Sequence, residues 1–459
     1  MNAHKVASLP AEARAWLGAV AGGTVSHAER SLSRREGWYV DVVQADGSAR
    51  HLFVRVARPG DPLNSLETLE KEAALAGVLT AAGVGVAPLV DSNATFHLAA
   101  YERLPGSSDI TTLSAPAQQA IYVRFVEDLG RLHCIDVDSL PMHDWHRPAS
   151  GRECALAGLD KLQADYEASV ARETSTARPS PLVAYGLRWL RDNAPEGLER
   201  LSLVHGDAGT PNFMFEAGEI TGIIDWEWAR YSDPMEDLGN ATLHAIFHPS
   251  GDWPELLAHY ERSSGIPVDV ERVAYYRAHL AIRSAITLGT ATATWNPHDP
   301  IALNLCYRTV IDRLCCDCMA SFAGMALERP QFQWQPDARP TLYGAVAGIL
   351  DAEVEPRVDS AFARGRAREA RLVVLALERE HQARPTLDAL DIDELTALLG
   401  HRPDDVRSGL AALCDRIVDG PADHDGTILQ YLARRAWREE QLLAPVVSLF
   451  PDLELRPLK

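Results

Sequence analysis

The sequence of 459 residues predicts an α+β fold: a small β-rich part at the N-terminus, a helical part after it, and a C-terminal all-α domain. Two runs rich in β-branched and aromatic residues, 38–43 and 51–56, flank the turn residues 45–48 and predict a β-hairpin. From residue 65 onward, apolar residues recur mainly at helical intervals. The segment 329–340 contains three prolines and cannot continue a helix, so it predicts a linker before the last domain.

The N-terminal part is expected to run from a first helix to a hinge. Residues 10–20 predict a helix before the hairpin, and residues 65–82 predict a second helix after it. The run 96–103 then leads to Leu104-Pro105-Gly106, which has the composition of a hinge. We therefore expect a first lobe over residues 1–104.

A second lobe, 105–328, and the tail after the linker, 341–459, are expected to be mainly helical. The helical stretches are 117–132, 160–193 with a break at 174–181, 256–260 and 273–288 in the lobe, and 342–354, 372–377, 387–399, 406–417 and 428–442 in the tail. The tail sequence contains no metal cluster, nucleophile elbow or phosphate loop. We therefore expect it to contribute no catalytic groups.

Composition narrows the class of protein. The formal net charge of -20 argues against nucleic acid as a partner, because neutralising phosphates requires a basic face. No run approaches the roughly 18 apolar residues of a membrane span, and the N-terminus does not have the pattern of a signal peptide, so we expect a cytoplasmic protein without membrane contact. Cys315, Cys316 and Cys318 lack a second cysteine pair or a spaced histidine, which favours buried reduced thiols over zinc.

The stretch 203–239, LVHGDAGTPNFMFEAGEITGIIDWEWARYSDPMEDLG, holds carboxylates and an amide at a spacing that suits phosphoryl transfer. His205-Gly206-Asp207 follow a short apolar strand, and Asn212 lies five residues after Asp207. A hairpin with its turn at 216–219 is expected to return the chain, and its second strand, 220–224, ends at Asp225.

The chemistry explains why these residue types belong together. Phosphoryl transfer from a nucleotide to an alcohol requires a divalent cation at the phosphates and a group that takes the proton of the attacking hydroxyl. Magnesium prefers oxygen ligands and keeps several waters, so Asn212 and Asp225 suffice if the hairpin brings them together. Asp207 would then face the substrate hydroxyl. A single aspartate at the end of a strand is usually a turn or cap residue; the whole set in this order is what indicates a site.

The pattern HGDxxxxN, followed by IDWE and DPxxDL, resembles the aminoglycoside-phosphotransferase and choline-kinase-like superfamily, whose members are distant relatives of protein kinases. The resemblance implies a bilobal protein-kinase-like fold and Mg²⁺-dependent transfer of the γ-phosphoryl group of ATP or GTP to a small-molecule hydroxyl. It implies that Asp207 is the catalytic base, that Asn212 and Asp225 bind the metal, and that His205 orders the catalytic loop. The segment 233–238 would brace the wall of the active site.

The same resemblance places the nucleotide site in the first lobe. The basic residue that grips the phosphates, usually a lysine on the third strand, is Arg55 here, and Glu72 on the next helix would pair with it. The backbone from Glu102 to Leu104 would hold the purine. The phosphate loop, 33–37, has one glycine where relatives often have two or more, although its arginines could substitute by charge.

The sequence leaves the acceptor and the role of the tail open. The strand around Arg55 and the tail, which resembles small helical proteins encoded beside acyl-CoA-dehydrogenase-linked kinases, favour a hydroxyacyl-CoA or hydroxy acid. The net charge favours a cationic antibiotic, an aminoglycoside or macrolide. The glycine-poor loop favours a pseudokinase that serves as a binding or regulatory module. The tail is expected to dock on the kinase part and help form the acceptor cleft; the alternative is assembly into a homo-oligomer.

Overall fold

The computed structural model describes residues 9–31, 36–57, 65–172, 179–248, 251–293, 295, 299–332, 334, 339–420, 425–450 and 453–459. The chain divides into two compact units. Unit 1 consists of 1–148, 199–270 and 456–459, and unit 2 of 149–198 and 271–455. Residues 149–198 and the helices after residue 271, which were expected to belong to the second lobe, thus group with the tail in unit 2. The domain boundaries expected from the sequence stay a prediction.

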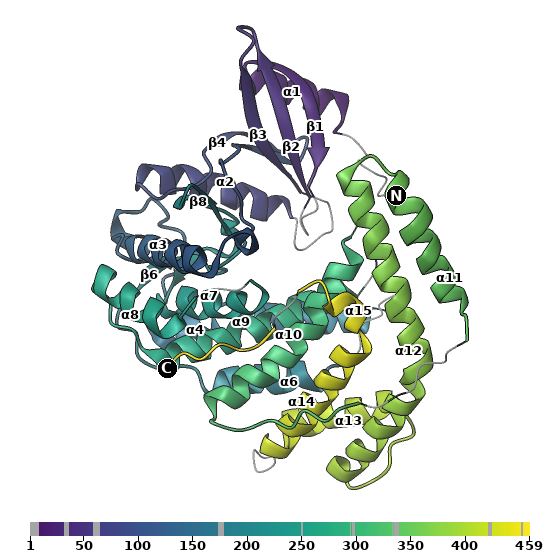
Figure 1. Cartoon of the computed structure of the whole chain (residues 1–459). Coiled ribbons are helices and arrows are strands. Elements are labelled where there is room, and N and C mark those ends of the chain that lie inside the picture. Colours follow the sequence, from purple (N-terminus) through teal and green to yellow (C-terminus); the bar gives the residue numbers. More distant parts are fainter. Residues whose placement is uncertain are drawn as a thin grey trace. The chain divides into compact units, whose positions relative to one another are not determined.

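Unit 1 begins with an antiparallel five-stranded sheet of order β1-β2-β3-β5-β4 (Figure 1). Its strands are β1 (Gly23–Arg30), β2 (Gly37–Gln44), β3 (Ala49–Val56), β4 (Leu89–Asn93) and β5 (Leu98–Glu102). The hairpin predicted around residues 45–48 is confirmed, because β2 and β3 pair from Gly37 opposite Arg55 to Val43 opposite Ala49. The edge strand β1 was not predicted, since its sequence, GTVSHAER, is mostly polar.

The sheet buries one face against the first helix. Trp38, Val40 and Val42 alternate along β2 and are buried, as the period of two along a strand requires. Helix α1 (Ala11–Ala21), which confirms the helix predicted at 10–20, packs Leu17 into the same cluster. The same apolar layer includes Leu52 and Val54 of β3, the strand that carries Arg55.

Helix α2 (Leu66–Ala81) follows as predicted. Ser65 begins it as an N-cap, because its side chain accepts a hydrogen bond from the main-chain N–H of Thr68 at 3.1 Å. Leu69, Leu75 and Leu79 are buried, and Glu72 is buried among them. The helix therefore presents Glu72 on its buried side.

The remainder of unit 1 carries the catalytic stretch. It contains α3 (Ala115–His133), β6 (Ser202–Val204), β7 (Phe213–Glu216), β8 (Glu219–Ile223), β9 (Arg230–Ser232), α7 (Met235–Phe247), α8 (Trp253–Ser264) and the short 3₁₀ turns Ile110–Thr112, Val137–Ser139 and Trp226–Trp228. Strands β7 and β8 form the predicted hairpin, whose turn residues Ala217 and Gly218 both have positive φ. Strand β6 pairs with β9, so the catalytic loop begins at the end of a two-stranded ribbon.

Unit 2 is helical. It contains α4 (Gly151–Leu156), α5 (Leu159–Ala171), α6 (Pro181–Asp192), most of α9 (Val270–Ala291), α10 (Ile301–Phe322), α11 (Leu342–Ile349), the π-helical turn Leu350–Val354, the 3₁₀ turn Glu355–Arg357, α12 (Ala361–Leu399), α13 (Val406–Asp419), α14 (Asp425–Leu442) and α15 (Ala444–Val447). The cysteines Cys315, Cys316 and Cys318 are buried on α10, as predicted. The break predicted at 174–181 lies largely outside the described residues. None of the described helices combines the length and apolar character that crossing a bilayer requires.

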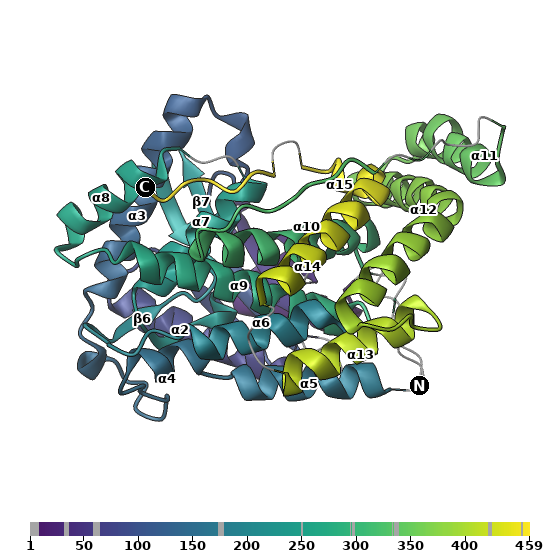
Figure 2. The same cartoon turned by 90° about the horizontal axis from the view of Figure 1, so that it is seen from below.

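Helix α12 corrects the prediction for the tail. Two separate segments were expected at 372–377 and 387–399, but residues 361–399 form one helix of 39 residues that passes through Pro385 (Figure 2). Proline removes a helical N–H and usually breaks a helix. Here Ala383 and Leu387, on either side of Pro385, pack in one apolar cluster with Leu442 of α14. Tertiary packing therefore maintains the helix across the proline.

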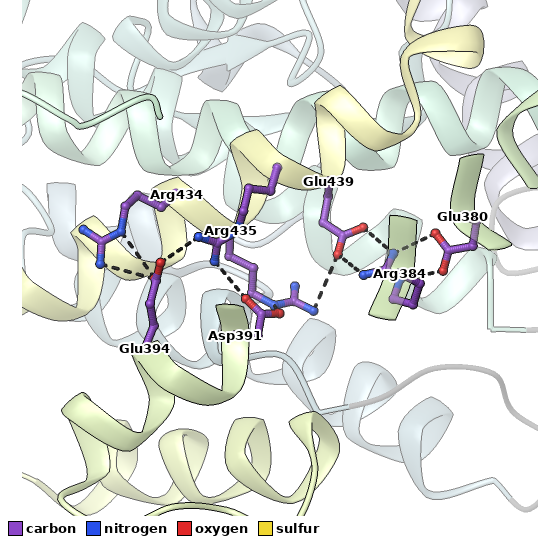
Figure 3. A network of polar contacts seen from close by, with 8 residues as sticks. Glu380, Arg384, Asp391, Glu394, Arg434, Arg435 and Glu439 are labelled. Carbon is purple, nitrogen blue, oxygen red and sulfur yellow. Dashed lines mark hydrogen bonds and ion pairs between the residues drawn. The ribbon is translucent and has the colours of Figure 1, made fainter. Parts of the chain in front are cut away.

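Ion pairs join residues 384–394 of α12 to residues 434–439 of α14 (Figure 3). Arg384 contacts Glu380 on its own helix at 2.7 Å and Glu439 on α14 at 2.6 Å. Asp391 receives Arg435 at 3.0 Å and Arg438 at 2.8 Å. Because the Asp391 side chain is only 3% exposed, it needs these partners to remain charged. The network fixes the register between the two helices.

Candidate active site

The catalytic loop begins at His205, directly after β6. The buried imidazole of His205 donates from Nε2 to the carbonyl oxygen of Ile224 at 2.9 Å and accepts at Nδ1 from the main-chain N–H of Asp207 at 3.2 Å. Both contacts are satisfied by one neutral tautomer with its proton on Nε2. His205 thus ties the loop that carries Asp207 to the strand that leads into Asp225. Its role in ordering a catalytic loop stays a prediction.

The side chain of Asp237 binds the main chain of the same loop. Its carboxylate is fully buried and accepts hydrogen bonds from the main-chain N–H groups of His205 at 2.7 Å and Gly206 at 2.8 Å. His133 Nε2 contacts it at 3.0 Å, while His133 Nδ1 contacts the Tyr260 hydroxyl at 2.7 Å. Burial alone would raise the pKa of Asp237, but these hydrogen bonds and the neighbouring histidines lower the pKa below its ordinary value. Asp237 therefore stays charged and structural.

Asp207 is held at both carboxylate oxygens. Asn212 Nδ2 donates to Asp207 Oδ2 at 2.9 Å and also to the Asp207 main-chain oxygen at 2.8 Å. His244 Nε2, from α7, lies 3.1 Å from Asp207 Oδ1. The Asp207 side chain is 21% exposed, so it is restrained yet reachable. His244 was not predicted from the sequence, because a histidine within an apolar helical pattern carries no signal of its own.

The β7–β8 hairpin brings Asn212 and Asp225 together. The main-chain N–H of Ile224 donates to the Asn212 carbonyl oxygen at 2.9 Å, and Asp225 is the next residue. Asp225 has φ 70° and ψ 55°, a left-handed conformation that is uncommon outside glycine and often marks functional sites. The β7–β8 hairpin therefore places the loops that carry Asn212 and Asp225 side by side, as the predicted magnesium site requires.

These two side chains fit the ligand requirement of magnesium. The amide nitrogen of Asn212 donates to Asp207, so its Oδ1 can serve as one hard oxygen ligand, and the Asp225 carboxylate can supply another. In the described part of the chain no cluster of three or more His, Cys, Asp or Glu side chains gathers as a metal site. A cation that takes two protein oxygens and several waters does not require one.

Arg55 contacts a different partner from the one expected. It forms an ion pair with Asp225 Oδ1, and both side chains are largely shielded from solvent. The expected partner, Glu72, lines the same small pocket as Arg55, together with Glu36, Ser65 and Thr68. The structure therefore brings Arg55 to both acidic residues, but the direct contact described is with the proposed metal ligand.

The hinge residues lie against the catalytic hairpin. Glu102 pairs with Arg50 at 2.8 Å, and its main-chain N–H donates to Pro88. The side chain of Leu104 packs on Gly222 of β8, where a Cβ would lie 2.6 Å from it. In the described residues the main-chain N–H of Leu104 donates to no other group, which leaves it available to a ligand. Residues 33–35 of the expected phosphate loop lie outside the described residues.

Main-chain hydrogen bonds join the hinge to the hairpin. Ser107 and Phe215 exchange two of them, at 3.0 and 2.9 Å, and the Ile223 N–H donates to Gly85 at 2.8 Å. The chain comes so close that Gly106, with φ 91°, could carry no side chain, since a Cβ would lie 2.0 Å from the Phe215 oxygen. The hinge and the strand leading to Asp225 therefore form one wall.

Comparison with known proteins agrees with this geometry. Residues 32–276 match the phosphotransferase enzyme family. Acyl-CoA dehydrogenase family member 11 of Rattus norvegicus is 28% identical over 171 residues, which is 35% of this chain and 20% of that protein. The probable acyl-CoA dehydrogenase IBR3 of Arabidopsis thaliana is 28% identical over 204 residues, 39% of this chain and 24% of that protein. The matched segment thus spans only about a fifth to a quarter of these relatives.

Among solved structures, a putative aminoglycoside phosphotransferase from Ralstonia eutropha is 18% identical, with a TM-score of 0.48 over 66% of this chain and 93% of that chain. The choline kinase of Streptococcus pneumoniae is 15% identical, with a TM-score of 0.47 over 68% of this chain and 98% of that one. The family match covers more than half of the residues, including the N-terminal sheet from β2 onward and the whole catalytic stretch. The chain therefore belongs to the phosphotransferase enzyme family, with the kinase-like fold expected from its sequence.

Proposed function

We propose that this phosphotransferase is a Mg²⁺-dependent kinase that moves the γ-phosphoryl group of ATP or GTP to a hydroxyl of a small molecule, most specifically a hydroxyacyl-CoA or hydroxy acid. The observation that carries the proposal is the Asp207 carboxylate, which is restrained at both oxygens and stands in one loop with Asn212. The hairpin places Asp225 beside that loop. This combination supplies a base and two oxygen ligands within one small region.

In the proposed reaction Asp207 accepts the proton of the acceptor hydroxyl as its oxygen attacks the γ-phosphorus. A new O–P bond forms, the bond between the γ-phosphorus and the β–γ bridging oxygen breaks, and the nucleoside diphosphate leaves with the bond's electron pair. The products are a phosphate ester and ADP or GDP. His205 and Asp237 keep the loop in place and take no part in bond making.

The remaining site residues bind the donor. Asn212 and Asp225 would hold Mg²⁺, which neutralises charge on the phosphates. Arg55 would exchange its ion pair with Asp225 for a phosphate oxygen, with Glu72 in the adjoining pocket as its second carboxylate. The backbone from Glu102 to Leu104 would bind the purine, since the Leu104 N–H points to no partner among the described groups.

The acceptor class is inferred from the relatives. Several curated relatives are named as acyl-CoA dehydrogenase family members, so a segment like this one occurs within proteins of acyl-CoA metabolism. A kinase in that setting would act on an acyl-CoA that carries a hydroxyl group. The test is a nucleotide-consumption screen over hydroxyacyl-CoA esters, free hydroxy acids, aminoglycosides and macrolides. Turnover confined to the antibiotics would overturn the acceptor assignment and leave the kinase assignment intact.

The test of the catalytic assignment is Asp207→Asn, which removes the base and its charge but preserves the shape. We expect turnover to fall by about 10²–10⁴-fold, the range of general acid–base catalysis. Asp252→Asn is the matched control, because Asp252 is an exposed N-cap of α8 and asparagine caps equally well. Undiminished turnover in Asp207→Asn would sink the assignment.

A pseudokinase is the second candidate, and the Arg55–Asp225 ion pair favours it. That pair occupies a carboxylate that the kinase needs for its cation. Calorimetry with ATP separates the two. A kinase should bind ATP more tightly with magnesium present, and Asp225→Ala should abolish that gain. A module that binds no nucleotide at any magnesium concentration would support the pseudokinase.

A further inference from the structure

Helix α7 contacts the catalytic loop at two points on one face. Asp237, in its first turn, holds the main-chain N–H groups of His205 and Gly206. His244 lies seven residues later, two helical turns along the same face, and reaches Asp207. The loop therefore rests on one rigid helix, which fixes its backbone at one end and its carboxylate at the other.

The second contact is close and well fitted. His244 Nε2 lies 3.1 Å from Asp207 Oδ1, and their side chains are 19% and 21% exposed. The loop packs directly on the ring: a Cβ on Gly209, whose φ is 138°, would lie 2.6 Å from His244 Cβ and 2.8 Å from its Cδ2. His244 is thus held between α7 and the loop, with its nitrogen directed at the carboxylate.

We propose that His244 is a positioning residue for the catalytic base: its Nε2–H holds Asp207 Oδ1 while Asn212 holds Oδ2, so that the carboxylate meets the acceptor hydroxyl in one orientation. This inference rests on the proposed kinase function. Because each carboxylate oxygen is held by a different side chain, the carboxylate cannot rotate freely. Without His244, the Asp207 carboxylate would lose the contact that holds Oδ1.

Two substitutions separate this role from simple packing. His244→Phe keeps a ring of similar size against Gly209 but removes the donor. His244→Gln keeps an N–H donor of similar reach. The control is His259→Phe on α8, which removes a similar contact, His259 Nε2 to Glu127 Oε1 at 2.9 Å, outside the catalytic loop.

The assay follows ADP release from Mg-ATP, with 3-hydroxybutyryl-CoA as acceptor and separately with water alone, using the full chain. We expect His244→Phe to lower kcat by about 10- to 100-fold, since a hydrogen bond to a charged group contributes that much. The KM and calorimetric Kd for Mg-ATP should not change. His244→Gln should recover most of the lost turnover, and His259→Phe should match the wild type.

Three outcomes would overturn the inference. One is a kcat for His244→Phe within about twofold of wild type. Another is equal loss in the Phe and Gln variants, which would indicate that packing alone is affected. The third is a rise in the KM for Mg-ATP without a fall in kcat. Failure of the proposed function gives a different result, because the wild type itself would then release no ADP or Asp207→Asn would keep full activity.

Discussion

Replacing Asp237 by asparagine tests whether one buried carboxylate organises the catalytic loop. Asp237 accepts from the N–H groups of His205 and Gly206 and contacts His133, at 2.7, 2.8 and 3.0 Å. Asparagine has the same shape but only one carbonyl oxygen. Its NH₂ group would therefore face at least one donor, either a main-chain N–H or the His133 ring.

The expected cost follows from these three contacts. Hydrogen bonds to a charged acceptor contribute about 1.5–3 kcal/mol each, and a buried donor left without an acceptor costs about 1–3 kcal/mol. One lost bond and two weakened ones should together destabilise unit 1 by about 3–5 kcal/mol, a large part of the roughly 5–15 kcal/mol that folds a typical domain. Turnover should fall as well, because the loop that carries Asp207 loses its support.

Urea unfolding, monitored by tryptophan fluorescence, measures the free energy of unfolding. The variant Asp252→Asn, at an exposed position, serves as the control. The difference also depends on pH. Because the folded pKa of Asp237 lies below its ordinary value of 3.8, the stabilisation is complete at neutral pH and is lost as the pH falls below about 4 through the folded pKa. A loss under about 1 kcal/mol at pH 7, or a loss that is independent of pH, would refute the reasoning.

Three further predictions concern the scaffold. Gly106→Ala should destabilise the chain by more than about 2 kcal/mol, because its Cβ would meet the Phe215 oxygen, whereas Gly47→Ala, with positive φ but open space, should cost about 1 kcal/mol in the same urea assay. Arg384→Met should lower the free energy of unfolding by about 1–3 kcal/mol, because Glu380 and Glu439 lose their guanidinium partner. Adding Glu439→Leu should recover part of this loss; an equal loss of stability in the single and double variants would contradict the prediction. Burial, and then the nearby His244, lower the pKa of His248 to about 4. The folded state should therefore lose stability as the pH falls from 6.5 to 4. In thermal melts, His248→Gln should reduce this dependence of stability on pH.

Local patterns predicted most elements of unit 1. The β2–β3 hairpin followed from two β-rich runs around Asp46-Gly47, and α2 from the helical period of residues 65–82. The β7–β8 hairpin was predicted from the Ala217-Gly218 turn. In each case the residues that decide the structure are neighbours in sequence, so the pattern carries the information.

Contacts between distant residues could not be read in the same way. His244 reaches Asp207 from 37 positions away, and nothing in its own helix distinguishes it from a packing residue. Arg55 was expected beside Glu72, but in the structure its ion pair is with Asp225, 170 positions along the chain. Both contacts depend on how α7 and the hairpin pack, which no local pattern records.

The tail shows the opposite error, a local rule that tertiary structure overrides. Separate segments were predicted at 372–377 and 387–399, yet α12 continues through Pro385 because Ala383 and Leu387 pack with Leu442 and because Arg384 is held by Glu439 of α14. The role expected for the tail, docking on the kinase part or assembling copies of the chain, stays a prediction.

The bonds between Ser107 and Phe215 and between Gly85 and Ile223 have a consequence for the choice of donor. They hold the backbone proposed to bind the purine at a fixed distance from the strand before Asp225. With the proposed roles, only a donor whose phosphate chain matches that distance brings its terminal phosphorus to Asp207. Nucleoside diphosphates should fall short and tetraphosphates should overshoot, so chain length, more than the identity of the purine, should decide which nucleotides this enzyme uses.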